Sequence, residues 1–304
     1  MGRCPETASG DLLTSIGVIA HQGKTLDGGL DELDRLLCER GFANAKWYGI
    51  TKSKQAPRAA RRAIEDGIDL ALVWGGDGTS QRCLDVFAGS SVCVGLLPAG
   101  TANLLASNLG IPTSVRGALD VALDGSKRLI DVGVLNGERF GNMAGAGIDA
   151  VSMKKAHGAM KDRLGKLAYV WTGVKAARAE PPMASIKVDG ERWFKGRASC
   201  LLFGNMGSLG VGLTAFPDAR PDDGILEIGV VTAAGVAQWA RVVACMLTGH
   251  PERSRFVQTT RGTDVKVKFD RAVPYELDGG HRAPTRKLRV SIERGAATVS
   301  VPER

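Results

Sequence analysis

The first part of the chain alternates short apolar runs with amphipathic stretches. Apolar runs rich in β-forming residues, bounded by polar or glycine-containing turns, predict strands at residues 15–20, 46–50, 68–74 and 92–97. Amphipathic stretches predict helices at residues 30–40, 57–66 and 81–87, with another beginning near Ala102. Because strands and helices alternate, residues 1–127 are expected to form an α/β domain with a doubly wound parallel sheet.

After residue 127 the pattern changes to many short strands with frequent turn residues. Asn136-Gly137 and Asp189-Gly190 each lie between two apolar segments, as in β-hairpins. Further strands are predicted at 199–203, 225–231, 264–269, 273–277, 288–292 and 297–301, and helices at 236–247 and within 160–177. Residues 128–304 are therefore expected to form an antiparallel β-sandwich domain. A return of the extreme C-terminus to the first domain is compatible with this expectation. The active site is expected in the cleft between the domains.

The strand at 68–74 continues into a glycine-rich turn, Gly75 to Ser80. Glycines expose backbone N–H groups there, and the turn leads into a predicted helix, so N–H groups and helix dipole would both attract phosphate. The strand at 92–97 ends in a similar turn, Pro98 to Asn103. Both turns, with Thr51, would lie at the carboxyl ends of the strands, where α/β sheets bind ligands. Capped turns without a ligand are the alternative.

Composition narrows the class of protein and its partners. The formal charge of +8 and the pI of about 9.3 favour anionic partners. No helix-turn-helix or zinc-finger pattern is present, so nucleic acid is not expected as a partner. The six cysteines lie far apart and suit a reduced, cytoplasmic protein. No apolar run approaches the ~18 residues of a membrane-spanning helix, and the first residues do not resemble a signal peptide.

Taken together, the motifs resemble the catalytic domain of the diacylglycerol kinase family, which includes bacterial lipid kinases and sphingosine kinases. The likeness begins with G-G-D-G-T at 75–79 and P-x-G-T-x-N at 98–103. It continues through nearly the whole chain, with I-D-V-G at 130–133, F-x-N at 140–142, G-A-G-I-D-A at 145–150, G-K-L-A-Y at 165–169, Asn205, P-x-A-x-x-D-D-G-x-L at 217–226 and L-D-G at 277–279.

The resemblance implies an ATP-dependent lipid kinase that transfers the γ-phosphate to a lipid hydroxyl, with diacylglycerol as the favoured acceptor and phosphatidic acid as the product. The positions that match its nucleotide site are Thr51, Trp74, Gly75, Gly76, Asp77, Gly78, Thr79, Ser80, Gly100, Thr101 and Asn103. Asp77 would act through Mg²⁺ or by orienting the phosphates. Asp278 matches the general base towards the lipid hydroxyl, although Asp278-Gly279 is also typical of a plain hairpin turn.

Two further sites follow only from the resemblance. Arg220, Asp223 and Ile225 match a structural Mg²⁺ site made of two backbone carbonyls and one carboxylate. A turn without metal is the alternative. Asp149 matches a position that contacts the polar head of the acceptor, with a capping or solvated aspartate as the alternative.

Three departures from the family pattern bear on activity. Residues 20–24 replace an N-P-x-S-G turn, Leu104 stands where many members carry aspartate, and Gly280 replaces the glutamate of a D-G-E element. Asp278 would therefore act alone, or with help from Glu276 or His281. An NAD kinase-like enzyme, whose family shares the G-G-D-G loop, and a catalytically weak nucleotide- or lipid-binding relative are the competing hypotheses.

A basic stretch with interleaved apolar residues covers 154–178. Such a pattern suits peripheral contact with an anionic membrane surface, while a helix packed on its own domain is the alternative. The expected location is the cytoplasm, with contact at the inner face of the membrane. A homodimer is one candidate assembly.

Overall fold

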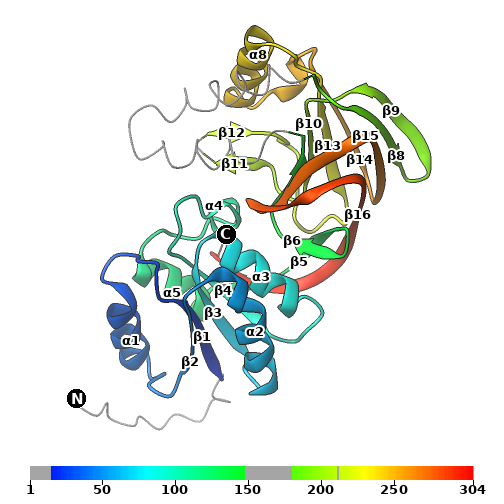
Figure 1. Ribbon diagram of the computed structural model, residues 1–304. Helices are drawn as coiled ribbons and strands as arrows, with labels where there is room; N and C mark the ends of the chain where they lie inside the picture. Colours follow the sequence, from blue (N-terminus) through cyan, green and yellow to red (C-terminus); the bar gives the residue numbers. More distant parts are fainter. Residues whose placement is uncertain (1–14, 148–179, 211, 304) are drawn as a thin grey trace. The chain divides into compact units, whose positions relative to one another are not determined.

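The computed structural model describes residues 15–147, 180–210 and 212–303, which form two compact units (Figure 1). The first unit runs to Ile130 and includes the chain again from Ala296, and the second covers Asp131–Gly295. Asp149, the basic stretch 154–178 and the helix predicted within 160–177 lie outside the described residues. Within the described ranges, no helix has the length and apolar character needed to cross a membrane.

The first unit contains a parallel sheet in the order β2 (Lys46–Ile50), β1 (Ile16–His21), β3 (Leu70–Gly75), β4 (Cys93–Pro98) and the end of β16 (Gly280–Val301). Strands β1, β3 and β4 are buried along their whole length. This fits a sheet covered on both faces, as parallel sheets usually are. The predicted α/β fold of this part is confirmed.

Helices cover this sheet (Figure 1): α1 (Gly29–Glu39), α2 (Ala56–Glu65), α3 (Asp77–Phe87), α4 (Leu104–Asn108) and α5 (Val115–Asp124), with a 3₁₀ turn η1 (Ser53–Gln55) before α2. The start of α3 was predicted wrongly, at Gln81. The helix begins four residues earlier because the N–H groups of Thr79 and Ser80 already donate to the carbonyl of Gly76. Helix α5 was not predicted, although Ser114 caps it by accepting the N–H of Gly117.

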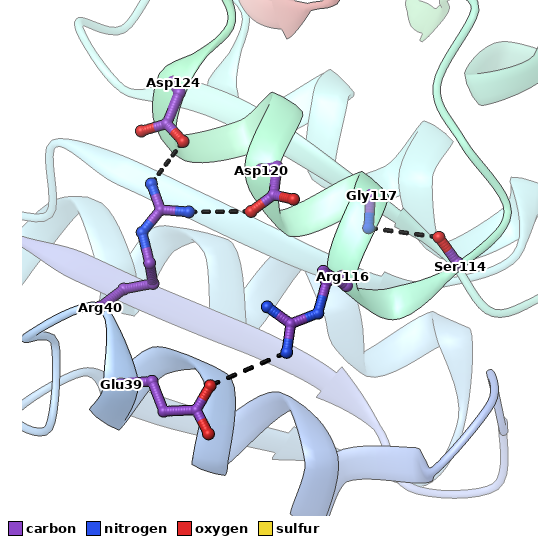
Figure 2. A network of polar contacts seen from close by, with 7 residues as sticks. All are labelled: Glu39, Arg40, Ser114, Arg116, Gly117, Asp120 and Asp124. Atoms are coloured by element: carbon purple, nitrogen blue, oxygen red, sulfur yellow. Dashed lines mark hydrogen bonds and ion pairs between the residues drawn. The ribbon is translucent and has the colours of Figure 1, made fainter.

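An ion-pair network ties the end of α1 to α5 (Figure 2). Arg40 donates to Asp120 at 2.8 Å and also to Asp124, one helical turn further along α5. Arg116 approaches Glu39 of α1 at 3.8 Å. Because these side chains are largely solvent-exposed, the network fixes the contact between the helices more than it adds stability.

The second unit is a β-sandwich-like domain whose two layers share β15 (Asp264–Leu277) and β16. One layer contains β14 (Val257–Gly262), β13 (Leu226–Val231), β10 (Cys200–Gly204), β7 (Met143–Ala146) and residues 275–277 of β15. The other contains β9 (Glu191–Arg197), β8 (Met183–Val188), residues 264–269 of β15, and β16 with β5 (Ser126–Leu135) and β6 (Glu138–Phe140). Its largest apolar core contains side chains from both layers.

The hairpins predicted at Asn136-Gly137 and Asp189-Gly190 are present, and Asp278-Gly279, for which a hairpin turn was the alternative interpretation, also forms one. Both residues of each turn have positive φ, at 50° and 90°, 49° and 91°, and 44° and 74° respectively, as type I′ hairpin turns require. Outside the layers lie the small hairpin β11 (Ser208–Gly210) and β12 (Leu213–Thr214), helix α8 (Val236–Leu247) and the 3₁₀ turn η2 (Pro251–Arg253). Helix α8 was predicted at these residues, whereas β14 was not predicted.

Candidate functional site

The turns after β3 and β4 touch each other through two glycines. A Cβ on Gly100 would lie 2.4 Å from Cα of Gly76, and a Cβ on Gly76 would lie 3.0 Å from Cα of Gly100. Any side chain at Gly100 would therefore collide with the backbone of the neighbouring turn. The two glycine-rich turns predicted from the sequence thus form one continuous backbone surface at the carboxyl ends of β3 and β4.

Asp77 joins the same two turns from the other side. It is the first residue of α3, and its Oδ1 accepts the N–H of Leu104, at the start of α4, at 2.5 Å. Burial raises the pKa of Asp77, and hydrogen bonds from the backbone around Asn103–Leu105 act in the opposite direction. The Asp77 carboxylate therefore positions the turn after β4. Leu104 contributes through its main chain, so the missing aspartate at this position does not disturb the link.

Asn103 holds the shape of the turn after β4. Its backbone is left-handed, with φ of 49°. The side-chain Oδ1 accepts the N–H of Gly100 at 2.9 Å, and Nδ2 donates to the carbonyls of Pro98 and Gly100 at 2.9 and 3.0 Å. All the polar atoms of the amide are used within the turn. Asn103 is therefore a residue that shapes the site, rather than one that extends from it.

The other predicted nucleotide residues differ in exposure. Trp74 is buried, and its indole donates to the carbonyl of Lys24 at 3.1 Å. Thr79 is also buried and shares a 3.0 Å hydrogen bond with Ser53, which connects α3 to the loop after β2. Thr51 is exposed and directs its hydroxyl to Gln55 at 3.2 Å, while Thr101 is exposed at the turn after β4. The contacts of Trp74 and Thr79 connect the turns after β1 and β2 to β3 and the turn that follows it. The side chain of Thr101 is exposed to solvent.

In the second unit, Asp278 occupies the turn between β15 and β16 and is only 5% exposed. Its carboxylate accepts the N–H groups of Gly141, Asn142 and Met143 at 2.8, 3.0 and 2.8 Å. The sequence suggested either a hairpin turn or a chemically active carboxylate. The structure shows the hairpin turn together with a buried carboxylate that anchors the segment before β7.

Glu276 lies two residues before Asp278 on β15, opposite Gly145 of β7 and His281 of β16. Its side chain is 18% exposed, and Oε2 lies 3.5 Å from Nδ1 of His281. Burial and then the negative charge of Asp278 raise the pKa of Glu276 to about 7. A Cβ on Gly145 would lie 4.0 Å from Oε1 of Glu276, and closer still to the carbonyl of Leu201 and the side chain of Leu202. Sequence reasoning named Glu276 only as a helper, since its environment depends on the pairing of distant strands.

The loop that contains Arg220, Asp223 and Ile225 is held by Asp131, a residue of the I-D-V-G motif for which no role was predicted. Its carboxylate accepts the N–H of Gly224 at 2.6 Å and that of Gly295 at 2.7 Å. Asp223 accepts the N–H of Ile225 through Oδ1 at 3.0 Å. In the part of the chain that is described, no three His, Cys, Asp or Glu side chains cluster as metal ligands. A cation at this loop would depend on one carboxylate and on backbone carbonyls.

Comparison with known proteins identifies the family. The family model "Diacylglycerol kinase catalytic domain" matches residues 21–135, and "YegS C-terminal NAD kinase beta sandwich-like domain" matches 142–301. A diacylglycerol kinase of Bacillus subtilis (strain 168) is 30% identical over 76% of this chain and 78% of its own. A protein of Chromohalobacter salexigens named "Probable lipid kinase YegS-like" is 31% identical over 81% of this chain and 80% of its own.

Solved structures support the fold. A diacylglycerol kinase from Bacillus anthracis str. Sterne has a TM-score of 0.73 at 19% identity, covering 95% of this chain and 97% of that one. An NAD kinase from Archaeoglobus fulgidus in complex with ATP has a TM-score of 0.53 at 11% identity, covering 95% and 94%. By class, the chain has the fold of these two kinase groups. It belongs to the diacylglycerol kinase and YegS-like family of lipid kinases.

Proposed function

We propose that this protein is an ATP-dependent kinase that phosphorylates the hydroxyl of diacylglycerol to give phosphatidic acid. The observation that carries the proposal is the pair of glycine turns packed backbone to backbone, in a chain whose relatives include proteins named diacylglycerol kinase. Phosphoryl transfer depends mainly on positioning and on electrostatic stabilisation of the phosphates. Rigid turns rich in N–H groups are suited to that task.

The phosphates of ATP would bind at the first unit, along the turns Gly75–Ser80 and Gly100–Asn103. The first N–H groups of α3, at Asp77 and Gly78, have no intrahelical acceptor and lie at the positive end of the helix dipole. Exposed Thr101 adds a hydroxyl at the second turn. Asp77 and Asn103 would serve this site by holding its shape through Leu104 and Gly100.

The acceptor hydroxyl would be activated by carboxylates of the second unit. In the proposed step the hydroxyl oxygen forms a bond to the γ-phosphorus, the bond from that phosphorus to the bridging oxygen breaks, and ADP leaves. The hydroxyl proton passes to a carboxylate, for which the sequence proposed Asp278. Glu276 is better suited, because a pKa of about 7 matches a proton acceptor that works near neutral pH. Asp278 would then hold the segment 141–143 and tune Glu276.

Mg²⁺, which would neutralise phosphate charge when bound with ATP, suits the oxygen donors of this chain. The loop with Arg220, Asp223 and Ile225 offers one carboxylate and backbone carbonyls, and only Oδ1 of Asp223 accepts a hydrogen bond among the described contacts. The guanidinium nearest this loop, Arg261, donates to Glu227 and to the carbonyl of Asp218, and the hydrogen bond and charge of Glu227, more than the charge of Asp223, raise the pKa of Arg261. We assign the loop a structural role, separate from the phosphates.

A lipid acceptor implies contact with a membrane, and we propose that the protein binds peripherally to an anionic surface. Asp149 as a contact to the acceptor's polar head and the basic stretch 154–178 as a membrane contact stay predictions, as does a homodimer. Cytoplasmic location is part of the same proposal.

Labelled ATP with Mg²⁺, offered in parallel to diacylglycerol, monoacylglycerol, ceramide, sphingosine and NAD, tests the function. We expect label in phosphatidic acid. Label in NADP would instead support an NAD kinase, to which the fold similarity to the Archaeoglobus fulgidus enzyme gives some weight. ATP binding without transfer to any acceptor would indicate a catalytically silent relative, as the loss of glutamate at Gly280 first suggested.

A further inference from the structure

The second unit carries a dense group of cations on one sheet face. Seven exposed lysine and arginine side chains occupy outward positions of the layer β9–β8–β15–β16, here named the cationic sheet face: Lys187, Arg192, Lys195, Lys266, Lys268, Lys287 and Arg289. The residues between them, such as Ile186, Val267 and Leu288, point to the apolar core. The alternation places these charges on the solvent side, and on β9 a shift in register between the pairs Ile186–Phe194 and Lys187–Arg192 places Arg192 opposite Lys187.

Strand register brings these cations directly opposite one another. Lys187 pairs with Arg192 on one side and with Lys266 on the other, and Lys266 in turn pairs with Arg289. In the adjacent outward row, Lys268 pairs with Lys287. Like charges placed directly opposite destabilise a sheet. Four such pairs on one face lower the stability of the sheet. Their presence is better explained by a role in binding than by a role in folding.

Few carboxylates neutralise this face. Within the described residues, the one ion pair made by these seven side chains joins Lys266 to Asp264 at 3.3 Å. Lysines on an edge strand can serve to block unwanted strand pairing. That explanation covers β9, which pairs only with β8, but β8 and β15 each have a strand on both sides. Protection of an edge strand therefore does not explain the lysines on β8 and β15.

We propose that the cationic sheet face docks on the surface of an anionic lipid bilayer. The choice of a bilayer rests on the proposed function, because a lipid acceptor has to be reached in its membrane. Lysine and arginine near an anionic leaflet are attracted over about a Debye length. Single-stranded nucleic acid is a poorer match, because no aromatic side chain occupies an outward position in the two rows, and stacking on aromatics is its usual mode of binding.

Sedimentation of the full-length protein with vesicles tests the proposal without ATP. The vesicles are phosphatidylcholine alone or phosphatidylcholine mixed with phosphatidylglycerol, with duplex and single-stranded DNA as separate ligands. The variant is Lys187→Glu with Lys268→Glu, and the control is Arg58→Glu with Arg61→Glu on α2, which makes the same change in net charge on exposed residues of the first unit.

We expect binding to the anionic vesicles only, weakened by salt, and weakened at least about 25-fold in the variant, at about fivefold for each charge removed. The control is expected to bind as the wild type does. Equal binding to both vesicle types, equal loss in variant and control, or binding to DNA in preference to vesicles would overturn the proposal. Misfolding is not expected, since glutamate at 187 faces Arg192 and Lys266, and thermal melting checks this.

An activity arm separates this proposal from the function itself. With a short-chain, water-soluble diacylglycerol, the Lys187→Glu, Lys268→Glu variant should retain wild-type activity, whereas activity on vesicle-embedded diacylglycerol should fall with the loss of binding. If neither the wild type nor the variant transfers phosphate to either acceptor, while the variant still binds anionic vesicles more weakly than the wild type, the proposed function is wrong and the docking face stands. If the wild type transfers phosphate and the variant is equally active on vesicle-embedded diacylglycerol, the proposed docking face is wrong and the proposed function stands.

Discussion

Glu276 and Asp278 are two carboxylates on one strand end with opposite surroundings. Asp278 is surrounded by three backbone N–H donors, whereas Glu276 faces an imidazole and a glycine. Burial, and then the negative charge on Asp278, raise the pKa of Glu276, so that it retains its proton to higher pH. Pairs of carboxylates held in different environments are often divided between a fixed charge and a group that exchanges protons. Under the proposed function, the same division would let Glu276 take the place of the glutamate that the D-G turn lacks.

Replacing the proposed proton acceptor tests its role. Glu276→Gln should lower kcat by about 10²- to 10⁴-fold, the usual contribution of a general base. The acceptor has to be deprotonated, so wild-type activity should rise with pH through about 7 and then level off. The variant should lose that rise. Initial rates from pH 5 to 9 measure it, and a wild-type pH profile in the variant would contradict the assignment.

Asp278→Asn distinguishes the two carboxylates. Asparagine tolerates the left-handed backbone at this position, where φ is 44°, and its single oxygen can still accept the N–H groups of Asn142 and Met143, so the turn should survive the loss of the bond to Gly141. If Glu276 accepts the proton, removing the charge of Asp278 lowers the pKa of Glu276, and the rise in activity moves to lower pH with activity largely retained. If Asp278 accepts the proton itself, the variant should lose activity as fully as Glu276→Gln was expected to.

At single positions the sequence predicts the local backbone conformation better than the role of a residue. The D-G pair at 278–279 was enough to expect a hairpin turn, because only a few residue types tolerate positive φ. The surroundings of Glu276, which the sequence named only as a helper, were not predictable, because they depend on strands β7 and β16 being paired beside it. Asp131 is a similar case, since its partners Gly224 and Gly295 are far away in sequence.

Between elements, the contact of Gly76 with Gly100 fixes how the turns after β3 and β4 fit together. A methyl group at residue 100 would lie 2.4 Å from the backbone of Gly76 and 2.5 Å from Oδ1 of Asn103, so one turn has to move. Gly100→Ala should lower kcat/KM for ATP by about a hundredfold, as displacements of about 1 Å commonly do. Steady-state kinetics at saturating acceptor measure this effect.

Gly235→Ala is the matched control for that substitution. Gly235 has no atom within 4 Å of an added Cβ and has an extended backbone with φ of −140°, so alanine fits there. We expect wild-type kinetics from this variant. Unchanged kinetics in Gly100→Ala as well would mean that the contact between the turns does not shape the ATP site.

The loop at 220–225 permits a test that does not involve the reaction. If Mg²⁺ binds through Asp223, Mg²⁺ without ATP should stabilise the wild type, by about 2.7 kcal/mol at a hundred times Kd, because it binds only the folded state. Asp223→Ala should lose this gain, while Asp222→Ala in the same loop should keep it. Thermal melting in Mg²⁺ and in chelator measures it. A wild type that does not respond to Mg²⁺ would remove the metal from this loop.

Element boundaries were predicted well where one local signal acts and poorly where tertiary pairing decides. Lys46–Ile50 forms β2 at the predicted residues. The strands predicted at 264–269 and 273–277 are one element, β15, because both halves pair with β16, while the first half also pairs with β8 and the second with β7. Strand β14 was missed because its sequence V-Q-T-T-R-G is mostly polar, and its place is set by pairing with buried β13.

At the scale of the whole molecule, the segment after Gly295 bears on the stability of the first unit. After Gly295 the chain leaves the second unit, and Thr298 and Val299 pair in parallel with Cys93 and Val94 of β4. Val299 is fully buried there. The chain end thus completes the sheet whose β3 and β4 carry the two glycine turns. The first unit is made of both ends of the sequence, so its stability depends on residues remote from the turns.

Val299→Ala removes two methyl groups from this buried position and should lower the free energy of unfolding of the first unit by about 2 kcal/mol. Hydrogen exchange followed peptide by peptide should show faster exchange in β3 and β4, while β13 and β14 of the second unit exchange as in the wild type. Val236→Ala, at a position 45% exposed in α8, is the control and should change neither unit. An equal loss of protection in both units would show that they unfold as one, and the chain end would then stabilise the second unit as much as the sheet it completes.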